Sequence, residues 1–283
     1  MPVGGDAAGA DGDAAMRVGF IGLGSQGAPM ARRIADGGYP ITLWARRAET
    51  LEPFADTAAN IAGSPAELGA ASDLVCLCVV ADADVDELAG GVLSAMPSGG
   101  VLAVHSTVHP DTCRRLAERA AAQGVSVIDA PVSGGGPAAE QGRLMVMVGG
   151  AGDVVERCRP VFETYADPVV HLGALGSGQT TKLLNNLLFT ANLATAATTL
   201  ALAEQLGVSP ERLTEVVSRG SANSFALNAL GGIGGLDRLA GVAGGLLRKD
   251  VRLVVDLAEG AGARAGAVLD AADAALTLLG HPR

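Results

Sequence analysis

The sequence is poor in aromatic residues and in charges, and it has few cysteines. Of its 283 residues, 3% are aromatic and 18% are charged, whereas 49% are hydrophobic. A chain with this much apolar side chain can bury sizeable cores, which excludes global disorder. Because aromatic rings are scarce, those cores must consist largely of Ala, Val and Leu, and the 40 glycines predict many tight turns. Since a domain typically has roughly 150 residues, the length predicts about two domains.

The cysteines do not have the spacing of a metal site. Cys76 and Cys78 lie in one apolar run, 74–80, and would face the same side of a strand, but no third or fourth ligand is nearby in the sequence. Together with Cys113 and Cys158, they are predicted to be small buried side chains in a reducing compartment. We therefore expect no metal and a cytoplasmic location.

Basic side chains are outnumbered in this chain. There are 20 Lys and Arg against 30 Asp and Glu, which gives a formal net charge of −10. Because an acidic surface repels phosphate backbones, nucleic-acid binding is not expected. An anionic ligand would have to be bound locally, by helix N-termini or by a few basic residues.

Neither a signal peptide nor a membrane span is predicted. Residues 1–15 are mostly Gly, Ala and Asp, lack the basic and apolar regions of a signal peptide, and are expected to form a disordered tail. Residues 183–203 carry no charge and are long enough to cross a bilayer, but their several Asn and Thr side chains are costly in lipid. We therefore expect this segment to be a helix surrounded by protein.

From residue 17 to residue 130, short apolar runs alternate with stretches of helical composition, and Gly or Pro marks the joins. This pattern is typical of βαβ units and predicts an α/β, Rossmann-type doubly wound sheet. The expected strands are 17–21, 41–44, 74–80, 101–104 and 125–129, with 144–148 and 169–171 as further strands at the far side of the sheet.

Strand signals stop after residue 178. Residues 179–206 predict one long helix, Gly207 is a good stop, and Ser209-Pro210 begins the next helix. We therefore expect a Rossmann domain at 16–178 and an all-α domain with a long central helix at 179–283. The second domain would serve substrate binding and dimerisation.

A G-x-G-x-x-G motif follows the first predicted strand and precedes a helical stretch. In such a motif one glycine makes the tight turn, one lets the backbone approach a pyrophosphate, and one lets the helix pack on the strand. The helix N-terminus then faces the phosphates. The predicted phosphate-binding residues are Gly22, Leu23, Gly24, Ser25, Gln26 and Gly27.

The end of the second strand predicts the cofactor type. A dinucleotide fold places the residue that contacts the ribose there, and an acidic side chain would bind the 2′-hydroxyl of NAD. This strand is instead followed by Ala45, Arg46 and Arg47, whose guanidinium groups suit a 2′-phosphate. We expect NADP(H) rather than NAD(H). Alternatively, both arginines are solvated surface charges and Glu49 reaches back to the ribose.

Three further segments carry polar residues that could do chemistry. Ser106-Thr107 lies at the carboxyl edge of a strand, where it borders a cofactor or caps the helix that begins near Pro110. The run 129–136 exposes backbone N–H groups around Ser133, Gly134 and Gly135, which would bind a carboxylate or form a flexible turn. Lys182 and Asn186 share one helix face, so Lys182 is either a buried acid/base or a lysine that snorkels from the helix end.

Together these segments resemble the β-hydroxyacid dehydrogenase family, which includes the 3-hydroxyisobutyrate dehydrogenases. The matching motifs occur in the family's order over residues 16 to about 275. They are G-L-G-x-x-G-x-P-M at 22–30, S-T-x-x-P at 106–110, D-A-P-V-S-G-G at 129–135, G-x-G-x-x-x-K-x-x-N-N at 176–186, and K-D at 249–250.

The resemblance implies a role for each motif. The cofactor would lie over the glycine loop, with Val79, Val80 and Thr107 along its path and Lys249 nearby. Ser133, Gly134 and Gly135 would hold the substrate carboxylate, and Asn186 would orient the substrate. Lys182 would exchange the proton of the substrate oxygen while the nicotinamide exchanges hydride.

The resemblance leaves several activities open. We expect a small 3-hydroxy acid of the 3-hydroxyisobutyrate type as substrate, with reduction of glyoxylate or succinic semialdehyde as the alternative. A phosphosugar substrate is less expected, because 6-phosphogluconate dehydrogenases have His-Asn where this chain has Asn185-Asn186. An imine reductase is also less expected, because those enzymes usually replace the lysine that this chain keeps as Lys182. The alternative to an enzyme is a non-catalytic protein that binds NADP.

Oligomerisation is also expected, because a long helix apolar on all faces must be covered on all sides. We predict a homodimer or homotetramer packed through residues 183–206. The chain departs from the usual pattern at His105, where relatives often have Asp, and at Gln26, where Met is usual. It ends at Arg283, where relatives usually carry a further helix that helps to complete the site, and the glycine-rich segment 231–245 predicts a mobile wall.

Overall fold

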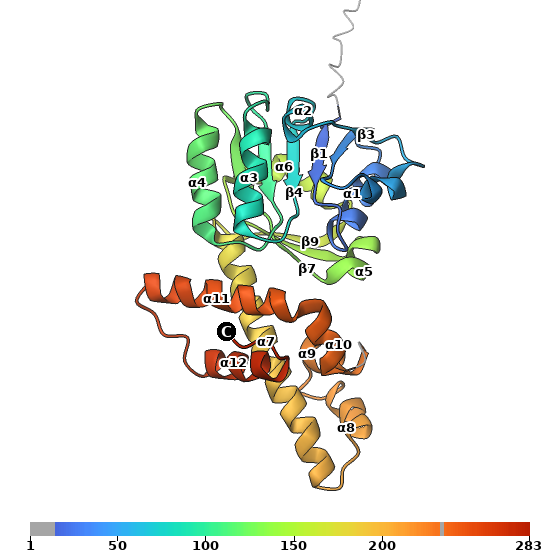
Figure 1. Ribbon diagram of the computed structural model, residues 1–283, viewed down its shortest axis with the longest axis vertical. Coiled ribbons are helices and arrows are strands. Elements are labelled where there is room, and N and C mark those ends of the chain that lie inside the picture. The colour runs from blue at the N-terminus through green and yellow to red at the C-terminus, as the bar shows by residue number, and fades with distance from the viewer. Residues whose placement is uncertain (1–14, 233–234) are drawn as a thin grey trace, which may run out of the picture.

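The computed structural model describes residues 15–232 and 235–283. The predicted tail therefore lies outside the described residues except for Ala15. The chain forms a sheet domain and a helical domain, and one long helix runs from the first into the second (Figure 1). The amino-terminal domain contains β1 (Val18–Ile21), α1 (Gly27–Asp36), β2 (Ile41–Trp44), a 3-10 helix (Ala48–Phe54), β3 (Asn60–Ile61), α2 (Pro65–Ala70), β4 (Leu74–Leu77), α3 (Asp82–Leu93), β5 (Val101–Val104), α4 (Pro110–Ala121) and β6 (Ser126–Asp129).

These strands form one parallel sheet with the order β3-β2-β1-β4-β5-β6. β1, β4 and β5 are buried along their whole length, as their uninterrupted apolar sequences require in a sheet covered on both faces. Met30 and Ile34 of α1 pack in the core on one face, whereas Val85 of α3 and Leu116 of α4 pack in the core on the other. The prediction of a Rossmann-type doubly wound sheet is confirmed.

The strands after residue 130 differ from the prediction. β7 (Val132–Ser133), β8 (Leu144–Val148) and β9 (Ala166–His171) form a separate three-stranded sheet with α5 (Gly135–Glu140) and α6 (Gly152–Phe162) between them. They do not extend the far side of the main sheet. Among the described residues, an isolated bridge from Asp129 to Gly149 is the one strand pairing between the two sheets. The chain turns away after β6 at Pro131, which has no N–H to donate to a ladder, and then pairs antiparallel with β8.

The helical domain is built around α7 (Ser177–Gln205), a helix of 29 residues that starts and ends within two residues of its predicted bounds. Gly207 has a φ of +79°, and the Ser209 hydroxyl accepts a hydrogen bond from the Arg212 N–H at 3.3 Å, as expected for the stop and the next start. The remaining elements are α8 (Pro210–Val217), α9 (Phe225–Gly232), α10 (Leu236–Leu239), a π-helical turn (Ala240–Gly244), α11 (Gly245–Gly260) and α12 (Ala267–Leu278).

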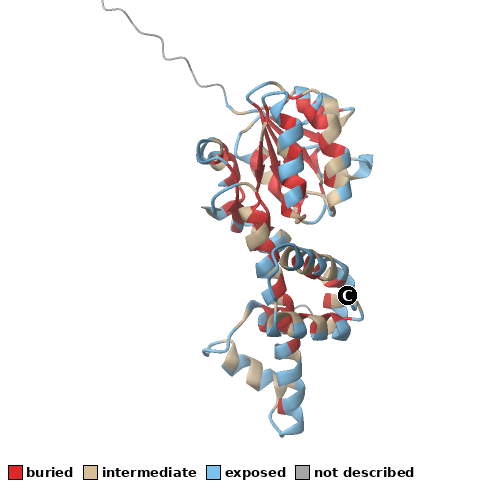
Figure 2. Cartoon of the chain, turned by 90° about the vertical axis from the view of Figure 1, so that its left-hand side faces the viewer, coloured by how far each residue is buried: buried red, intermediate tan, exposed pale blue. Residues whose placement is uncertain are grey.

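By length and composition α7 could cross a membrane, with a mean hydropathy of 1.3 over its most apolar window. Its buried residues, which include Leu183, Leu187 and Leu193, instead form a core with α9, α11 and α12. We interpret α7 as the core helix of this domain. A third of the apolar window is buried in the single chain, and Figure 2 shows long exposed stretches toward the outer end of the helical domain.

The carboxyl ends of the main-sheet strands face the helical domain, and α11 crosses α7 on the side next to the sheet domain (Figure 1). In an open α/β sheet this edge is where ligands bind. The fold thus brings the glycine loop, the turns after β4 and β5, and the start of α7 to the junction of the two domains. The domain boundary at residue 178 stays a prediction. The first turn of α7 lies beyond that boundary in the sequence but is hydrogen-bonded to the sheet domain.

Candidate active site

The glycine loop between β1 and α1 has the geometry of a phosphate-binding turn. Gly22 has a φ of +101°, and a Cβ at this position would clash with the backbone of Cys78. A Cβ on Gly27 would clash with the carbonyl oxygen of Gly22. Gly24, by contrast, has open space where a Cβ would be. Two of the glycines are therefore required by packing, and the third leaves its backbone open to a ligand.

The side chains around this loop also leave room for a ligand. Leu23 is buried, whereas Ser25 is exposed. Gln26 stands at the N-cap of α1 without a capping hydrogen bond from its side chain, which lies against the Met30 sulfur at 4.0 Å. The first N–H groups of α1 therefore have no side-chain acceptor at the N-cap. An anionic ligand can use them, so the loop fits the pyrophosphate of a dinucleotide.

The turn after β4 continues this surface. Val79 is half-buried, and its N–H donates to the Ser106 hydroxyl at 2.8 Å. Val80 has 61% of its side chain exposed at the carboxyl edge of the sheet. An apolar side chain left open beside a phosphate-binding turn suits the flat, partly apolar body of a nicotinamide dinucleotide.

The two arginines after β2 are exposed and paired with acids. Arg46 donates to Glu87 at 2.9 Å and lies 3.5 Å from Asp84, both on α3. The Arg47 guanidinium lies 3.9 Å from Glu49. The half-buried Ala45 separates them from Trp44 at the end of β2. Arg46 is thus held at the position where a dinucleotide fold places the ribose, by acidic side chains that a bound phosphate would have to replace.

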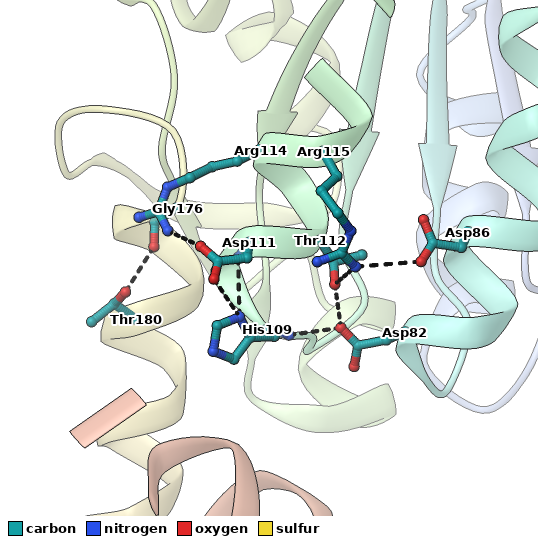
Figure 3. A network of polar contacts seen from close by, with 9 residues as sticks. All are labelled: Asp82, Asp86, His109, Asp111, Thr112, Arg114, Arg115, Gly176 and Thr180. Atoms are coloured by element: carbon teal, nitrogen blue, oxygen red, sulfur yellow. Dashed lines mark hydrogen bonds and ion pairs between the residues drawn. The ribbon is translucent and has the colours of Figure 1, made fainter. Parts of the chain in front are cut away.

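The loop after β5 is fixed by hydrogen bonds from several elements. Ser106 does not cap α4; that N-cap is His109, whose Nδ1 accepts from the Asp111 N–H at 3.2 Å. On the α3 side, Asp82 accepts from the His109 N–H at 2.9 Å and from the Thr112 hydroxyl at 2.6 Å (Figure 3). Thr107 lies within this fixed loop, half-buried at the carboxyl edge of the sheet.

The glycine run after β7 lies beside the glycine loop. Gly134 and Gly135 are exposed, with φ values of +130° and +77°, and α5 begins at Gly135. Ser133 is half-buried and pairs with Met145 of β8. A Cβ on the next residue, Gly136, would lie 2.7 Å from the Ser25 carbonyl oxygen. The backbone here is open to a ligand, as a carboxylate cradle requires.

A buried carboxylate anchors the start of α7 to the sheet domain. Asp129, at the end of β6, accepts from the Gly176 N–H at 2.6 Å and from the Gln179 N–H at 2.7 Å. Burial raises the pKa of Asp129, and these backbone donors act in the opposite direction. The carboxylate satisfies N–H groups that a helix N-terminus otherwise leaves unpaired. It thereby fixes where the first turns of α7 stand relative to the sheet.

Lys182 and Asn186 follow on the next turns of α7 and meet α11. Lys182 is only 8% exposed, so it does not snorkel into solvent. The Asn186 side-chain N–H donates to Asp250 at 2.6 Å, and Asp250 is itself buried. The Lys249 ammonium lies 2.8 Å from the other Asp250 oxygen, off the axis of a hydrogen bond, and donates to the Thr107 carbonyl at 2.5 Å. One chain of contacts thus joins α7, α11 and the loop after β5.

The electrostatics of this cluster suit proton transfer. Burial lowers the pKa of Lys182 to about 8, and the charge of Asp250 acts against that shift. A lysine whose pKa lies this close to neutrality can hold or release its proton at working pH, as a general acid or base must. When protonated, it is also a cation that stabilises negative charge developing on a nearby oxygen.

His105, the departure next to Ser106, is a core residue. It is 2% exposed, its Nδ1 lies 2.6 Å from the Ala130 carbonyl oxygen, and its Nε2 lies 3.2 Å from the Tyr165 hydroxyl. Phe20 stacks on its ring and Phe162 packs edge-on. Burial lowers the pKa of His105 to about 4. The neutral imidazole therefore holds the backbone at Ala130, between Asp129 and Pro131, through a hydrogen bond inside the sheet domain.

Sequence reasoning missed two residues of this site. Asp250 was named only as part of the K-D motif and was given no role. Gln179 was not singled out, although its side chain is fully buried and bonded to the loop after β5. Asp250 lies 64 positions from its partner Asn186, and Gln179 lies 73 positions from Ser106. No clear signal in the sequence marks either residue, because other charged residues surround Asp250 on α11 and other polar residues surround Gln179 at the start of α7.

The chain matches two models of known protein families. Residues 17–173 match the family model of the NAD binding domain of 6-phosphogluconate dehydrogenase. Residues 176–278 match the model of the NAD-binding domain of NADP-dependent 3-hydroxyisobutyrate dehydrogenase. Together the two models span the sheet domain, the long helix and the helical bundle.

Individual relatives agree. The 3-hydroxyisobutyrate dehydrogenase of Pseudomonas aeruginosa is 33% identical over 75% of this chain and 72% of that protein. The 2-(hydroxymethyl)glutarate dehydrogenase of Eubacterium barkeri is 33% identical over 76% of this chain and 72% of that protein. A structure of Mycobacterium tuberculosis 3-hydroxyisobutyrate dehydrogenase with L-serine superposes with a TM-score of 0.82 at 28% identity, covering 94% of this chain and 95% of that one.

The family models cover nearly the whole chain, and the tuberculosis structure matches 94% of it. The two sequence relatives are named as dehydrogenases of hydroxy acids, and both family models are described as NAD-binding. The chain belongs to the β-hydroxyacid dehydrogenase family, as an NAD(P)-dependent, 3-hydroxyisobutyrate dehydrogenase-like member.

Proposed function

We propose that this protein interconverts a small 3-hydroxy acid and the corresponding aldehyde or keto acid, with Lys182 as the general acid and base. The observation that carries the proposal is the buried ammonium of Lys182, with a pKa of about 8, beside the Asn186–Asp250 pair. The relatives named for 3-hydroxyisobutyrate and 2-(hydroxymethyl)glutarate act on acids of this class, and the tuberculosis enzyme was solved with L-serine.

In the oxidation direction, neutral Lys182 takes the proton of the substrate hydroxyl. In the reduction direction, the protonated ammonium returns that proton to the carbonyl oxygen. A bound nicotinamide would supply the other half of the chemistry, the exchange of a hydride (one proton with two electrons) with the substrate carbon. Asn186, held by Asp250, orients the substrate, and Ser133, Gly134 and Gly135 bind its carboxylate.

The experiment is a panel of initial rates. Purified protein would be assayed with 3-hydroxyisobutyrate, L-serine and 2-(hydroxymethyl)glutarate for oxidation, and with glyoxylate and succinic semialdehyde for reduction. Turnover of one of the 3-hydroxy acids supports the proposal. Turnover limited to the aldehyde acids would replace it with a glyoxylate or succinic semialdehyde reductase. Cofactor binding without any turnover would favour a non-catalytic NADP-binding protein.

We further propose that the cofactor is NADP(H). Support comes from Arg46 and Arg47 after β2 and from the absence of an acidic residue at the end of that strand. Trp44 is the sole tryptophan of the chain and stands two residues before Arg46, so quenching of its fluorescence reports cofactor binding.

The Arg46→Gln variant should bind NADPH roughly tenfold more weakly, the loss expected of one charge-assisted contact, and bind NADH as before. Arg114→Gln, which removes a surface arginine on α4, is the control. Equal losses for NADPH and NADH, or none, would overturn the NADP assignment.

Two further parts of the proposal concern assembly and location. We propose a homodimer or homotetramer that packs through residues 183–206, where Leu184, Leu188 and Leu202 are each more than half exposed. Light scattering tests this directly, and a monomeric mass would contradict it. A cytoplasmic location fits the four cysteines, which are all unpaired thiols.

A further inference from the structure

The side chain of Gln179 makes hydrogen bonds to both sides of Thr107. Gln179 lies in the first turn of α7 and is fully buried. Its Nε2 donates to the Ser106 carbonyl oxygen at 2.7 Å and, at 3.5 Å, to the Val104 carbonyl oxygen at the end of β5. Its Oε1 accepts from the Val108 N–H at 3.1 Å. One amide thus satisfies the two peptide groups that flank Thr107.

The start of α7 does not depend on these bonds. The Gln179 N–H is already bonded to Asp129, and so is the N–H of Gly176. The side chain therefore acts on the loop after β5 rather than on the helix. The same loop is held from α11 by Lys249 at Thr107 and from α3 by Asp82 at His109 (Figure 3 shows the Asp82 side).

Gln179 also shares a helix face with Lys182. Residues three apart on a helix are neighbours, so a shift of the loop relative to Gln179 is a shift relative to Lys182. No other side-chain hydrogen bond within residues 15–232 and 235–283 joins this loop to α7. The amide is the direct link between the element that carries the lysine and the strand edge along which the nicotinamide would lie.

We propose that Gln179 is a positioning residue that sets the distance between the Thr107 loop and Lys182. The inference rests on the proposed function, in which Thr107 borders the cofactor and Lys182 transfers the proton. The loop keeps its other two anchors without Gln179, so loss of the amide should misalign the reacting groups more than it weakens cofactor binding. Misplacement of such groups by about 1 Å costs as much as roughly 100-fold in rate.

The uncharged amide of Gln179 donates through its nitrogen and accepts through its oxygen. Gln179→Met keeps the approximate shape and removes the side-chain hydrogen bonds, which leaves the Ser106 carbonyl and the Val108 N–H unpaired. An ionised Glu at this position accepts from Val108 but repels the Ser106 carbonyl. A protonated Glu restores the donor and acceptor pattern of the amide.

The test compares Gln179→Met, Gln179→Glu and the matched control Thr180→Val. Thr180 is the next residue on α7, and its hydroxyl bonds only within the helix, to the Gly176 carbonyl at 2.9 Å. Initial rates with NADPH or NADP⁺ would be measured from pH 5.5 to 9.5, Trp44 quenching would give the NADPH affinity, and circular dichroism would report folding.

We expect Gln179→Met to lower kcat by roughly 10- to 100-fold while the NADPH affinity changes less than about threefold. Relative to wild type at each pH, Gln179→Glu should lose activity as pH rises and the carboxyl ionises. Thr180→Val should match wild type. A folded Gln179→Met with the kcat of Thr180→Val would overturn the inference. If Gln179→Met does not fold, a Gln179→Glu whose activity relative to wild type does not vary with pH would overturn it.

A parallel Lys182→Met assay separates this inference from the proposed function. Retained turnover in Lys182→Met would mean that the proposed function fails. An inactive Lys182→Met beside an unaffected Gln179→Met would mean that the role of Gln179 alone fails.

Discussion

The two ends of α7 differ in what surrounds them. At its start, the helix is buried against the sheet domain, and its polar groups are bonded to Asp129 and to the loop after β5. At its outer end, Leu202 and Leu206 are 53% and 71% exposed. The start holds fixed the groups that would carry chemistry, whereas the outer end offers apolar surface to another molecule. Hydrogen-bonded polar groups fix the inner end, and exposed leucines make the outer end the surface on which we propose that the chain assembles.

Removing the anchor of the inner end should have the largest effect. Asp129→Ala leaves the N–H groups of Gly176 and Gln179 buried without an acceptor, at a cost of roughly 1–3 kcal/mol each. We expect the free energy of unfolding in urea to fall by about 4 kcal/mol. The control is Asp153→Ala, an exposed aspartate in the first turn of α6. Equal losses in the two variants would remove the distinction between an anchored and an ordinary helix start.

Burial of His105 predicts that the free energy of unfolding depends on pH. Its pKa is lowered to about 4 in the folded protein, whereas a free histidine has about 6.5, so the unfolded chain binds the proton first as pH falls. Stability should be fully present above pH 6.5 and should decline by about 3 kcal/mol as pH falls toward 4.

Urea unfolding at pH 7 and at pH 4.5 measures this decline. In His105→Gln the amide can still donate to the Ala130 carbonyl but does not titrate. The decline should therefore be smaller in this variant by the part that belongs to His105, and an unchanged pH slope would show that the histidine is not the titrating group.

Substitution of Asp250 tests how the inner end of α7 sets the pKa of Lys182. Asp250→Asn removes the charge that raises the pKa of Lys182, so the pKa seen in the pH profile of kcat/KM should fall below about 8. Loss of the charged bond to Asn186 should also lower kcat/KM by roughly tenfold or more. Asp256→Asn, an exposed aspartate on the same helix, is the control. A pH profile that moves upward would contradict this reading of the cluster.

The outer end should show the smallest effect on chemistry and a clear effect on assembly. The double substitution Leu202→Ser, Leu206→Ser should reduce the mass measured by light scattering toward that of one 28.1 kDa chain. Ile61→Ser removes a side chain of similar exposure from the sheet domain and should leave the mass unchanged. An oligomer that survives the double substitution would place the interface elsewhere.

The sequence sufficed for features that depend on neighbours along the chain. The glycine loop, the Ser209 cap and the shared face of Lys182 and Asn186 all follow from local spacing and are found as predicted. The separate sheet of β7, β8 and β9 was not foreseen, because a period-two pattern identifies a strand but not its partner. Asp250 and Gln179 were missed for the same reason: their partners come from distant elements that only the packed domains bring together.

The central claim is that Lys182 carries the proton, and its pH-rate profile tests that claim most directly. For wild type we predict that kcat/KM for oxidation rises with pH through about 8, as the lysine loses its proton, and that kcat/KM for reduction falls over the same range. Lys182→Met should lose roughly 10²- to 10⁴-fold in rate and keep its Trp44-detected affinity for NADPH. A Lys182→Met enzyme that retains the wild-type rate and the same pH profile would contradict the account.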